Sequence, residues 1–151
     1  MQPLDLSASP PRSCYCELDG LMLMPRTIDK LRAQLPGGNA GIYFINGTQM
    51  RGLSGYLLGR IGVTEAELRE AVRDAPDEDA VALWLRGRTD AAAYPTISET
   101  LRRIKPKHSE NEALFRAEYV ETLAQQPELE YIVDIIEADD RRRFPSIQQE
   151  T

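Results

Sequence analysis

Apolar side chains recur at helical spacing along most of this sequence. In the first such segment five of them lie three or four residues apart, namely Leu21, Met24, Ile28, Leu31 and Leu35. This spacing predicts a helix with one stripe facing a core. Because proline cannot donate a hydrogen bond to the carbonyl four residues earlier, Pro25 predicts either a kink or the start of a new helix. The Leu-Pro-Gly-Gly sequence at residues 35–38 ends this helix.

Helix-start signals divide the rest of the chain. A second helix is predicted from apolar positions 53, 56, 57 and 61, and its glycines at 52, 55 and 59 permit close packing or end it early. Capping boxes, in which Ser or Thr precedes Glu by three residues, predict three further starts: Thr64-x-x-Glu67, Thr96-x-x-Glu99 and Ser109-x-x-Glu112. Asp77 predicts the cap of another helix, which buries Trp84, and Pro127 separates the last two helices.

The predicted fold is all-α. One short apolar run, residues 41–45, is compatible with a strand, a buried extended segment or a turn of helix, but no partner strand and no hairpin turn is apparent. About seven short helices with short connections predict one irregular bundle in a single domain. We expect a flexible N-terminal arm at residues 1–13, a helical domain at 14–140 and a polar tail at 141–151. Within the domain, residues 108–140 are expected to form an acidic helical pair packed on the rest.

The composition is that of a soluble globular protein, with 42% hydrophobic and 28% charged residues. No apolar run approaches the roughly 20 residues that span a bilayer, and residues 1–11 lack the features of a signal peptide, so we expect a cytoplasmic protein. The net charge of −6 is concentrated in residues 108–151, which carry 11 acidic and 4 basic side chains. An acidic segment of this size argues against nucleic acid as the main partner.

The residues offer little support for metal, redox or nucleotide chemistry. Cys14 and Cys16 are too close in sequence to form a good disulfide, and the single histidine, His108, lies far from both. The glycine-rich nucleotide loops are not present. The late acids Asp139 and Asp140 lie on the solvent side of an apolar stripe, which favours a solvated face over a metal or acid–base site. We therefore expect no metal and no cofactor.

The opening helix carries a charge pattern that a solvated face does not require. Arg26, Asp29 and Arg32 are spaced by three residues, away from the apolar stripe, and Lys30 lies beside them. One interpretation is a ladder of salt bridges between residues three apart. The other is a basic cluster, oriented by Asp29, that binds a carboxylate or phosphate near the positive end of the helix dipole.

The same residues carry a resemblance to a known family. From Leu23 to Ala33 the sequence resembles the pattern Leu-Pro-Arg-x-Ile-Asp-Lys-x-Arg-Ala of a bacterial family known as domain of unknown function number five thousand and sixty-nine. The resemblance extends more loosely over residues 12–140 and implies a small helical cytoplasmic protein with no assigned activity. Members often carry an acidic residue in the loop before the second helix. Here that loop reads Asn-Gly-Thr-Gln at residues 46–49, which argues against a carboxylate-based site there.

The leading hypothesis is a non-enzymatic protein that binds an anionic small molecule or a partner protein beside the opening helix. In this hypothesis Arg26, Lys30 and Arg32 meet the negative charge. Asp29 orients them, and Tyr43 lies at the rim of the groove. One alternative is a small hydrolase or transferase that uses carboxylate and arginine side chains, which requires a carboxyl group of perturbed pKa in a cleft near Arg26. Another is a homo-oligomeric structural protein, which requires an exposed apolar patch of roughly several hundred Å².

Overall fold

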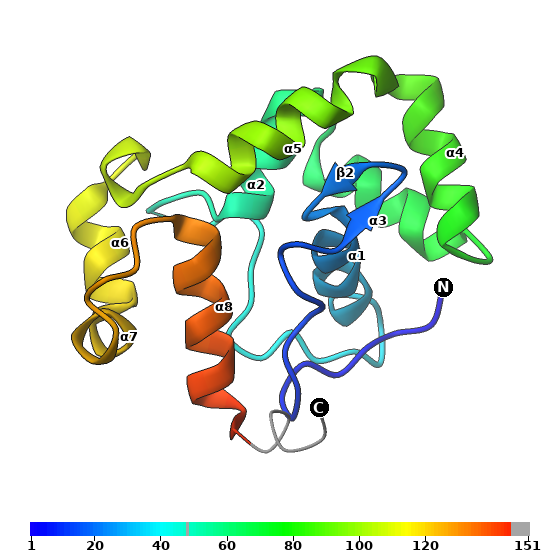
Figure 1. Ribbon diagram of the computed structural model, residues 1–151. Helices are drawn as coiled ribbons and strands as arrows, with labels where there is room; N and C mark the ends of the chain where they lie inside the picture. Colours follow the sequence, from blue (N-terminus) through cyan, green and yellow to red (C-terminus); the bar gives the residue numbers. More distant parts are fainter. Residues whose placement is uncertain (48, 146–151) are drawn as a thin grey trace. The chain divides into compact units, whose positions relative to one another are not determined.

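The computed structural model describes residues 1–47 and 49–145, and in this part of the chain the fold is mainly helical, as predicted (Figure 1). Within these residues the eight α-helices are α1 (Met24–Ala33), α2 (Leu53–Ile61), α3 (Glu65–Asp74), α4 (Glu78–Arg88), α5 (Tyr94–Arg103), α6 (Glu112–Glu118), α7 (Val120–Gln125) and α8 (Ile132–Arg143). The described chain also has two 3₁₀ helices and two strands: η1 (Ala91–Ala93), η2 (Pro106–His108), β1 (Glu17–Leu18) and β2 (Leu21–Met22). None of these helices is long and apolar enough to cross a membrane. The end of the predicted polar tail, residues 146–151, lies outside the described residues.

The expected number of about seven helices is one lower than the number found in the described chain. The single helix predicted between the Ser109 capping box and Pro127 is divided into α6 and α7. At Tyr119 the backbone leaves helical geometry, with φ −110° and ψ 27°. The rings of Phe115 and Tyr119 still lie 4.8 Å apart, so the apolar pattern predicts their proximity but not the break between the two helices.

The chain forms two compact units, Met1–Ser98 and Glu99–Thr151, and the boundary falls within α5. In the first unit α1 contacts α2, α3 and β1, and every residue from Met24 to Leu31 is buried. Pro25 lies in the first turn of α1, so the alternative of a new helix is confirmed. The central element of this unit is therefore a helix whose charged side chains are buried as well as its apolar ones.

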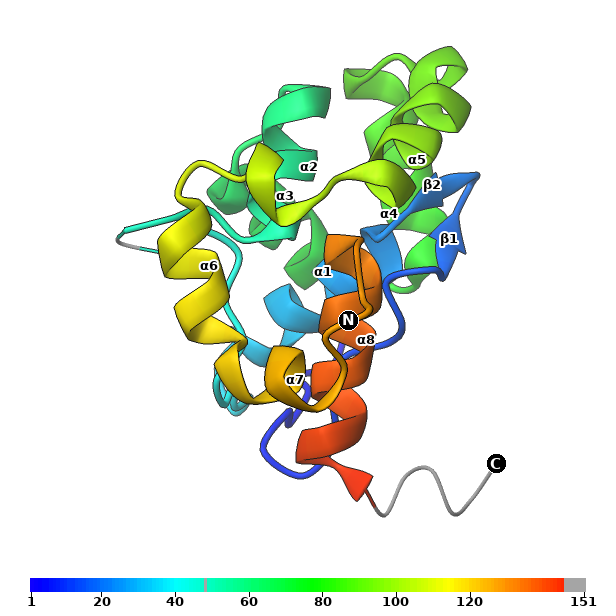
Figure 2. The same cartoon turned by 60° about the vertical axis from the view of Figure 1, so that its left-hand side comes forward.

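A short β-hairpin precedes α1, and the prediction that no hairpin exists is wrong. Its turn is formed by Asp19 and Gly20, which have φ angles of 55° and 83°. Two central residues with positive φ make the tight turn that suits the twist of paired strands, and Asp-Gly is a favoured sequence for it. Ser98 Oγ accepts a hydrogen bond from Met22 N at 2.9 Å and donates one to Gly20 O at 2.8 Å. The hairpin thus lies beside α5 (Figure 2). An ion pair between Asp19 and Arg86 links it to α4.

Two of the four predicted helix caps are confirmed. Thr64 Oγ1 accepts from Glu67 N at 3.1 Å, while the Glu67 carboxylate accepts from Thr64 N at 3.3 Å. This reciprocal pair is the predicted capping box of α3. At the start of α4, Asp77 accepts from Ala80 N at 2.9 Å.

The other two predicted caps, at Thr96 and Ser109, are wrong. Thr96 lies inside α5, because η1, which Asp90 caps, leads directly into that helix at Tyr94. Asn111 caps α6 by accepting from Leu114 N at 3.1 Å. Asn111 is adjacent to the start of α6, and Asp90 is adjacent to the start of η1, which continues into α5; Asp and Asn are both strong capping residues.

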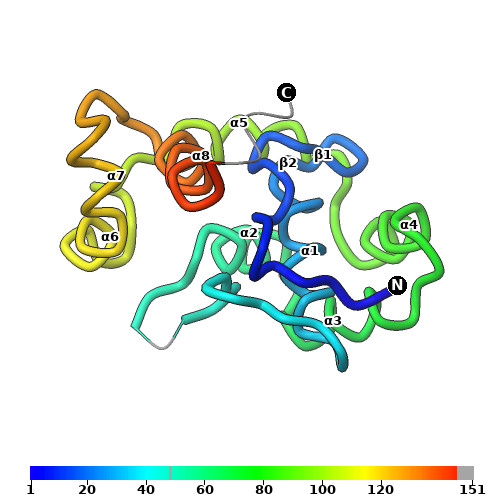
Figure 3. Tube along the Cα trace, turned by 90° about the horizontal axis from the view of Figure 1, so that it is seen from below, coloured from blue at the N-terminus to red at the C-terminus, as the bar shows by residue number. Residues whose placement is uncertain are grey.

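The segment predicted as an arm, residues 1–13, runs past the end of α1 and the segment that follows it (Figure 3). Leu4 N donates to Arg32 O at 3.2 Å, and Leu6 N donates to Asn39 O at 2.7 Å. The side chain of Leu6 is buried. Backbone hydrogen bonds and one apolar contact therefore hold this segment within the first unit.

In the second unit α8 contacts α7, and buried carboxylates lie near the C-terminal end of α8. The exposed fractions of Asp139 and Asp140 are only 4% and 7%, so the prediction of a solvated face is wrong. Asp139 accepts hydrogen bonds from Thr122 Oγ1 and Arg143 Nε, both at 2.8 Å. These donors compensate the cost of removing the carboxylate from water.

We expect the variant Asp19→Asn to melt below the wild type at pH 7, by a difference that shrinks as the pH falls below the ordinary pKa of Asp. Hydrogen bonds from Arg86 lower the pKa of Asp19 in the folded protein from its ordinary 3.8. A carboxyl group with a lowered folded pKa contributes stability above its unfolded pKa and loses that contribution as the pH falls through the folded value. Asparagine keeps the positive φ that the turn requires, so the comparison isolates the charge.

Thermal melts of both proteins between pH 2 and pH 7 test this expectation. Arg86→Gln is the matched control, and it should reproduce the loss, with little further loss in the double variant. A melting difference of equal size at pH 2 and pH 7 would show that the turn backbone, rather than the ion pair, causes the effect.

Candidate functional site

The charged side chains predicted as a site on α1 are largely buried. The exposed fractions of Arg26, Asp29 and Lys30 are 2%, 4% and 7%. Arg32 and Tyr43 are partly exposed. The face of α1 that carries these charges is therefore covered by protein rather than exposed to solvent. The helical period predicts which residues share this face, but it does not predict that other segments of the chain cover it.

Asp29 binds the arm rather than its neighbours on the helix. Its carboxylate accepts hydrogen bonds from Arg12 N at 2.8 Å, Arg12 Nε at 3.1 Å and a terminal guanidinium nitrogen of Arg12 at 3.0 Å. The same guanidinium pairs with Glu78 on α4, and this hydrogen bond raises the pKa of Arg12. Arg12 thus connects three elements and stays charged.

Lys30 lies within a network of polar groups formed by α1, α2 and the loop that connects them. Its ammonium donates to Phe44 O at 3.1 Å and to Ser54 Oγ at 3.4 Å. Thr27 Oγ1 donates to Leu23 O at 2.9 Å and lies 2.8 Å from Ser54 Oγ. These contacts hold the loop that carries Phe44 against α1.

Arg26 and Tyr43 lie together, and Arg32 lies elsewhere. The guanidinium carbon of Arg26 is 5.4 Å from the centroid of the Tyr43 ring, within the range of a cation–π interaction. A terminal nitrogen of Arg26 donates to Arg12 O at 3.2 Å. Arg32 Nε donates to Gln2 O at 2.8 Å, near the end of the helix. The structure therefore brings Arg26, Lys30 and the segment at residues 43–44 together, and we call this group the basic cluster.

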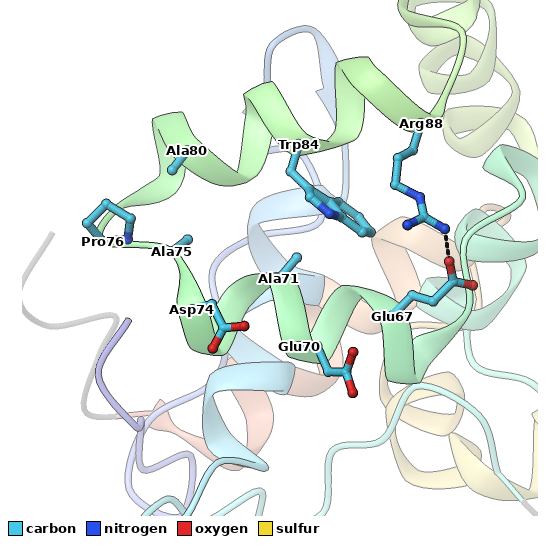
Figure 4. A pocket seen from close by; sticks show the side chains of 9 residues that line it. All are labelled: Glu67, Glu70, Ala71, Asp74, Ala75, Pro76, Ala80, Trp84 and Arg88. Atoms are coloured by element: carbon cyan, nitrogen blue, oxygen red, sulfur yellow. Dashed lines mark hydrogen bonds and ion pairs between the residues drawn. The ribbon is translucent and has the colours of Figure 1, made fainter.

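Sequence reasoning missed a second place, a hollow of 410 Å³ between α3 and α4 (Figure 4). Its lining residues are Glu67, Glu70, Ala71, Asp74, Ala75, Pro76, Ala80, Trp84 and Arg88. The acids recur three and four residues apart on α3, and this signal is present in the sequence but is typical of a solvated helix face. Trp84 was predicted to be buried, but it is partly exposed and forms a wall of the hollow.

The charges that line the hollow are already partly paired. Glu67 pairs with Arg88, and the guanidinium carbon of Arg88 lies 4.9 Å from the centroid of the Trp84 ring. Hydrogen bonds from Thr64 lower the pKa of Glu67, and those from Arg73 lower the pKa of Asp74. Both carboxylates are therefore ionised at neutral pH. Among the described residues, no cluster of three or more His, Cys, Asp or Glu side chains is arranged to hold a metal ion.

We expect Asp29→Asn to lower the free energy of unfolding by about 1–3 kcal/mol. The substitution weakens every hydrogen bond that Arg12 makes to the carboxylate of a residue only 4% exposed. Urea denaturation measures the loss. The control is Asp74→Asn, which breaks an ion pair with Arg73 whose side chains are 68% and 56% exposed, and it should change stability far less than Asp29→Asn does. Equal losses in the two variants would contradict a special role for Asp29.

We expect Gly55→Ala to destabilise the protein by about 1–3 kcal/mol because it overpacks the contact between α2 and the loop before it. A Cβ at Gly55 would lie 2.5 Å from Asn46 Oδ1 and 2.7 Å from Ile45 O. Gly87→Ala in α4 is the matched control, since a Cβ there has no atom within 4 Å. It should be neutral or stabilise the helix by up to about 1 kcal/mol. Denaturation curves with the same sign for both variants would contradict this interpretation.

A comparison with known proteins places the whole helical part of the chain in one family. The family described as Domain of unknown function (DUF5069) matches residues 8–142, a span that contains both the basic cluster and the hollow. No protein of curated function matches the sequence. Because the match covers most of the chain, the protein belongs to the DUF5069 family.

Proposed function

We propose that the protein is a non-enzymatic binding protein whose basic cluster takes an anionic group of a small molecule or of a partner protein. The carrying observation is the arrangement of Arg26 and Lys30, which lie one turn apart on α1 and contact consecutive residues of one loop. Arg26 lies against the ring of Tyr43, and Lys30 binds Phe44 O. Two cations held by one loop offer a carboxylate or phosphate more than one charged donor.

The surroundings of the basic cluster support binding of this kind. In a buried site the effective dielectric is low, so the attraction between a cation and an anion is stronger than at an open surface. The contacts of Arg26 with Arg12 O and Tyr43 fix its side chain beforehand, which reduces the entropy lost on binding. Ile42 and Phe44 are 55% and 37% exposed on the same loop, so a ligand with an apolar part, or a protein surface, also finds a contact there.

The alternative of a carboxylate-based hydrolase or transferase has weaker support. A general acid that works near neutral pH needs a raised pKa. Hydrogen bonds lower the pKa values of Asp5, Asp19, Glu67 and Asp74 instead. Binding therefore accounts for the geometry with fewer assumptions than catalysis does.

The test is a thermal-shift titration with phosphate and citrate against chloride at equal ionic strength. At a ligand concentration ten times Kd, we expect wild-type protein to gain about 1.4 kcal/mol, which raises the melting temperature by a few degrees. Lys30→Met removes one cation, and Tyr43→Leu removes the ring beside Arg26, so both should lose most of this shift. Arg60→Met is the control, because it removes an exposed cation of α2 outside the cluster.

Three results would contradict the proposal. The first is a wild-type protein that neither anion stabilises beyond chloride. The second is an anion shift that Arg60→Met loses as fully as Tyr43→Leu does. The third is a full anion shift in Tyr43→Leu and in Lys30→Met. Tyr43 is partly exposed, so its variant keeps the proposal testable if Lys30→Met fails to fold.

A further inference from the structure

The hollow between α3 and α4 joins an acidic rim to an aromatic wall and a floor of small side chains. Glu70 and Asp74 project from α3, and the indole of Trp84 projects from α4 toward them (Figure 4). Ala71 and Ala75 lie between these walls. A volume of 410 Å³ is enough for a small ligand or for one or two side chains of a partner.

One end of the hollow already holds a cation of the protein's own. The guanidinium of Arg88 lies over the Trp84 ring at 4.9 Å and pairs with Glu67. An aromatic face beside a carboxylate is the arrangement that attracts organic cations. The contacts of Arg88 therefore show that this surface can hold a cationic group between an aromatic ring and a carboxylate.

Of the remaining acids of the rim, Asp74 is paired with Arg73, whereas Glu70 has no partner of this kind. Glu70 is exposed and makes no hydrogen bond or ion pair with any described residue. Asp74 lies one turn further along α3 and points to the same side as Glu70 (Figure 4). Both residues lie in the second half of α3. At this helix end the N-terminal ammonium of Met1 already donates to the carbonyls of Val72, Arg73 and Ala75, so the side chains rather than the helix end must attract a second cation.

We propose that this hollow binds an alkylammonium group, either the side chain of a lysine in a partner protein or a free polyamine. The ammonium lies between Glu70 and Asp74, and the methylene chain lies on the alanine floor against Trp84. The aliphatic body distinguishes this ligand from a bare metal ion, which would gain nothing from the alanines or the indole. This site is separate from the basic cluster and selects the opposite charge. A failure of the anion proposal therefore leaves this proposal unaffected, and the reverse also holds.

The location of the single tryptophan makes the proposal directly measurable. Trp84 is the one tryptophan of the chain and lines the hollow, so its fluorescence reports on occupancy of the hollow itself. Spermidine and a short acetylated peptide with two lysines are titrated separately into the full chain at low salt. A response to the peptide alone assigns the site to partner proteins, and a response to spermidine assigns it to polyamines as well.

Two variants test the geometry in opposite directions. Glu70→Gln removes one carboxylate without changing the shape of the hollow, and it should weaken binding about two- to fivefold, the range expected of an exposed ion pair. Arg88→Gln removes the competing guanidinium from Trp84 and Glu67, and it should strengthen binding by a similar factor. Glu118→Gln is the matched control, since Glu118 is exposed, makes no described hydrogen bond or ion pair, and lies on α6.

The outcomes separate cleanly. Saturable fluorescence changes in the wild type and Glu118→Gln, weakened in Glu70→Gln and strengthened in Arg88→Gln, support the site. Absence of any saturable response to either probe overturns it. So does a response that is equal in Glu70→Gln and Glu118→Gln, because it reflects net charge alone, and so does weaker binding in Arg88→Gln.

Discussion

Asp29 places a carboxylate on a helix that is buried on nearly all sides, and much of the first unit is arranged to satisfy it. A buried carboxylate without a partner bears the full cost of its removal from water, so the chain must bring a cation to this point. Arg12 does so from the arm, and its guanidinium also reaches Glu78 on α4. The buried ammonium of Lys30 also needs partners, and it finds them in Phe44 O of the loop after α1 and in Ser54 of α2. Charge burial on α1 thus positions the arm, the loop, α2 and α4 around one helix.

Local signals in the sequence predicted the parts of the fold that depend on neighbouring residues. The capping box at Thr64 and the cap at Asp77 were predictable because donor and acceptor lie within one helical turn. The hairpin was missed because strands of two residues are too short to display an alternating pattern, although the Asp19-Gly20 turn was present in the sequence. At Thr96 the capping-box sequence is present, but α5 already begins two residues earlier, at Tyr94. It does so because the preceding η1 continues directly into it.

The candidate sites were predictable only where one helix carries the signal. Arg26 and Lys30 were singled out because they share α1. Their burial, however, depends on the arm and on the loop at residues 43–44, and the helical period of α1 carries no information about either segment. The hollow needs two helices to approach each other with small side chains between them. From α3 alone, Glu70 is one acid on a polar face, and from α4 alone, Trp84 belongs in a core. The turn at Pro76 between the helices places these residues opposite each other. The helical pattern of α3 or of α4 taken alone does not predict this arrangement.

Burial also decides how each site can discriminate among ligands. At the basic cluster Arg26 is 2% exposed, so an anion that reaches it must give up nearly all of its water. For the proposed anion to bind, the protein donors must replace the lost hydrogen bonds, so we expect the basic cluster to select by the geometry of the anionic group. At the hollow Glu70 remains in water, where screening makes each charge contact weak. For the proposed alkylammonium ligand we therefore expect most of the affinity to come from the apolar body packed against Trp84, with charge mainly orienting the ligand.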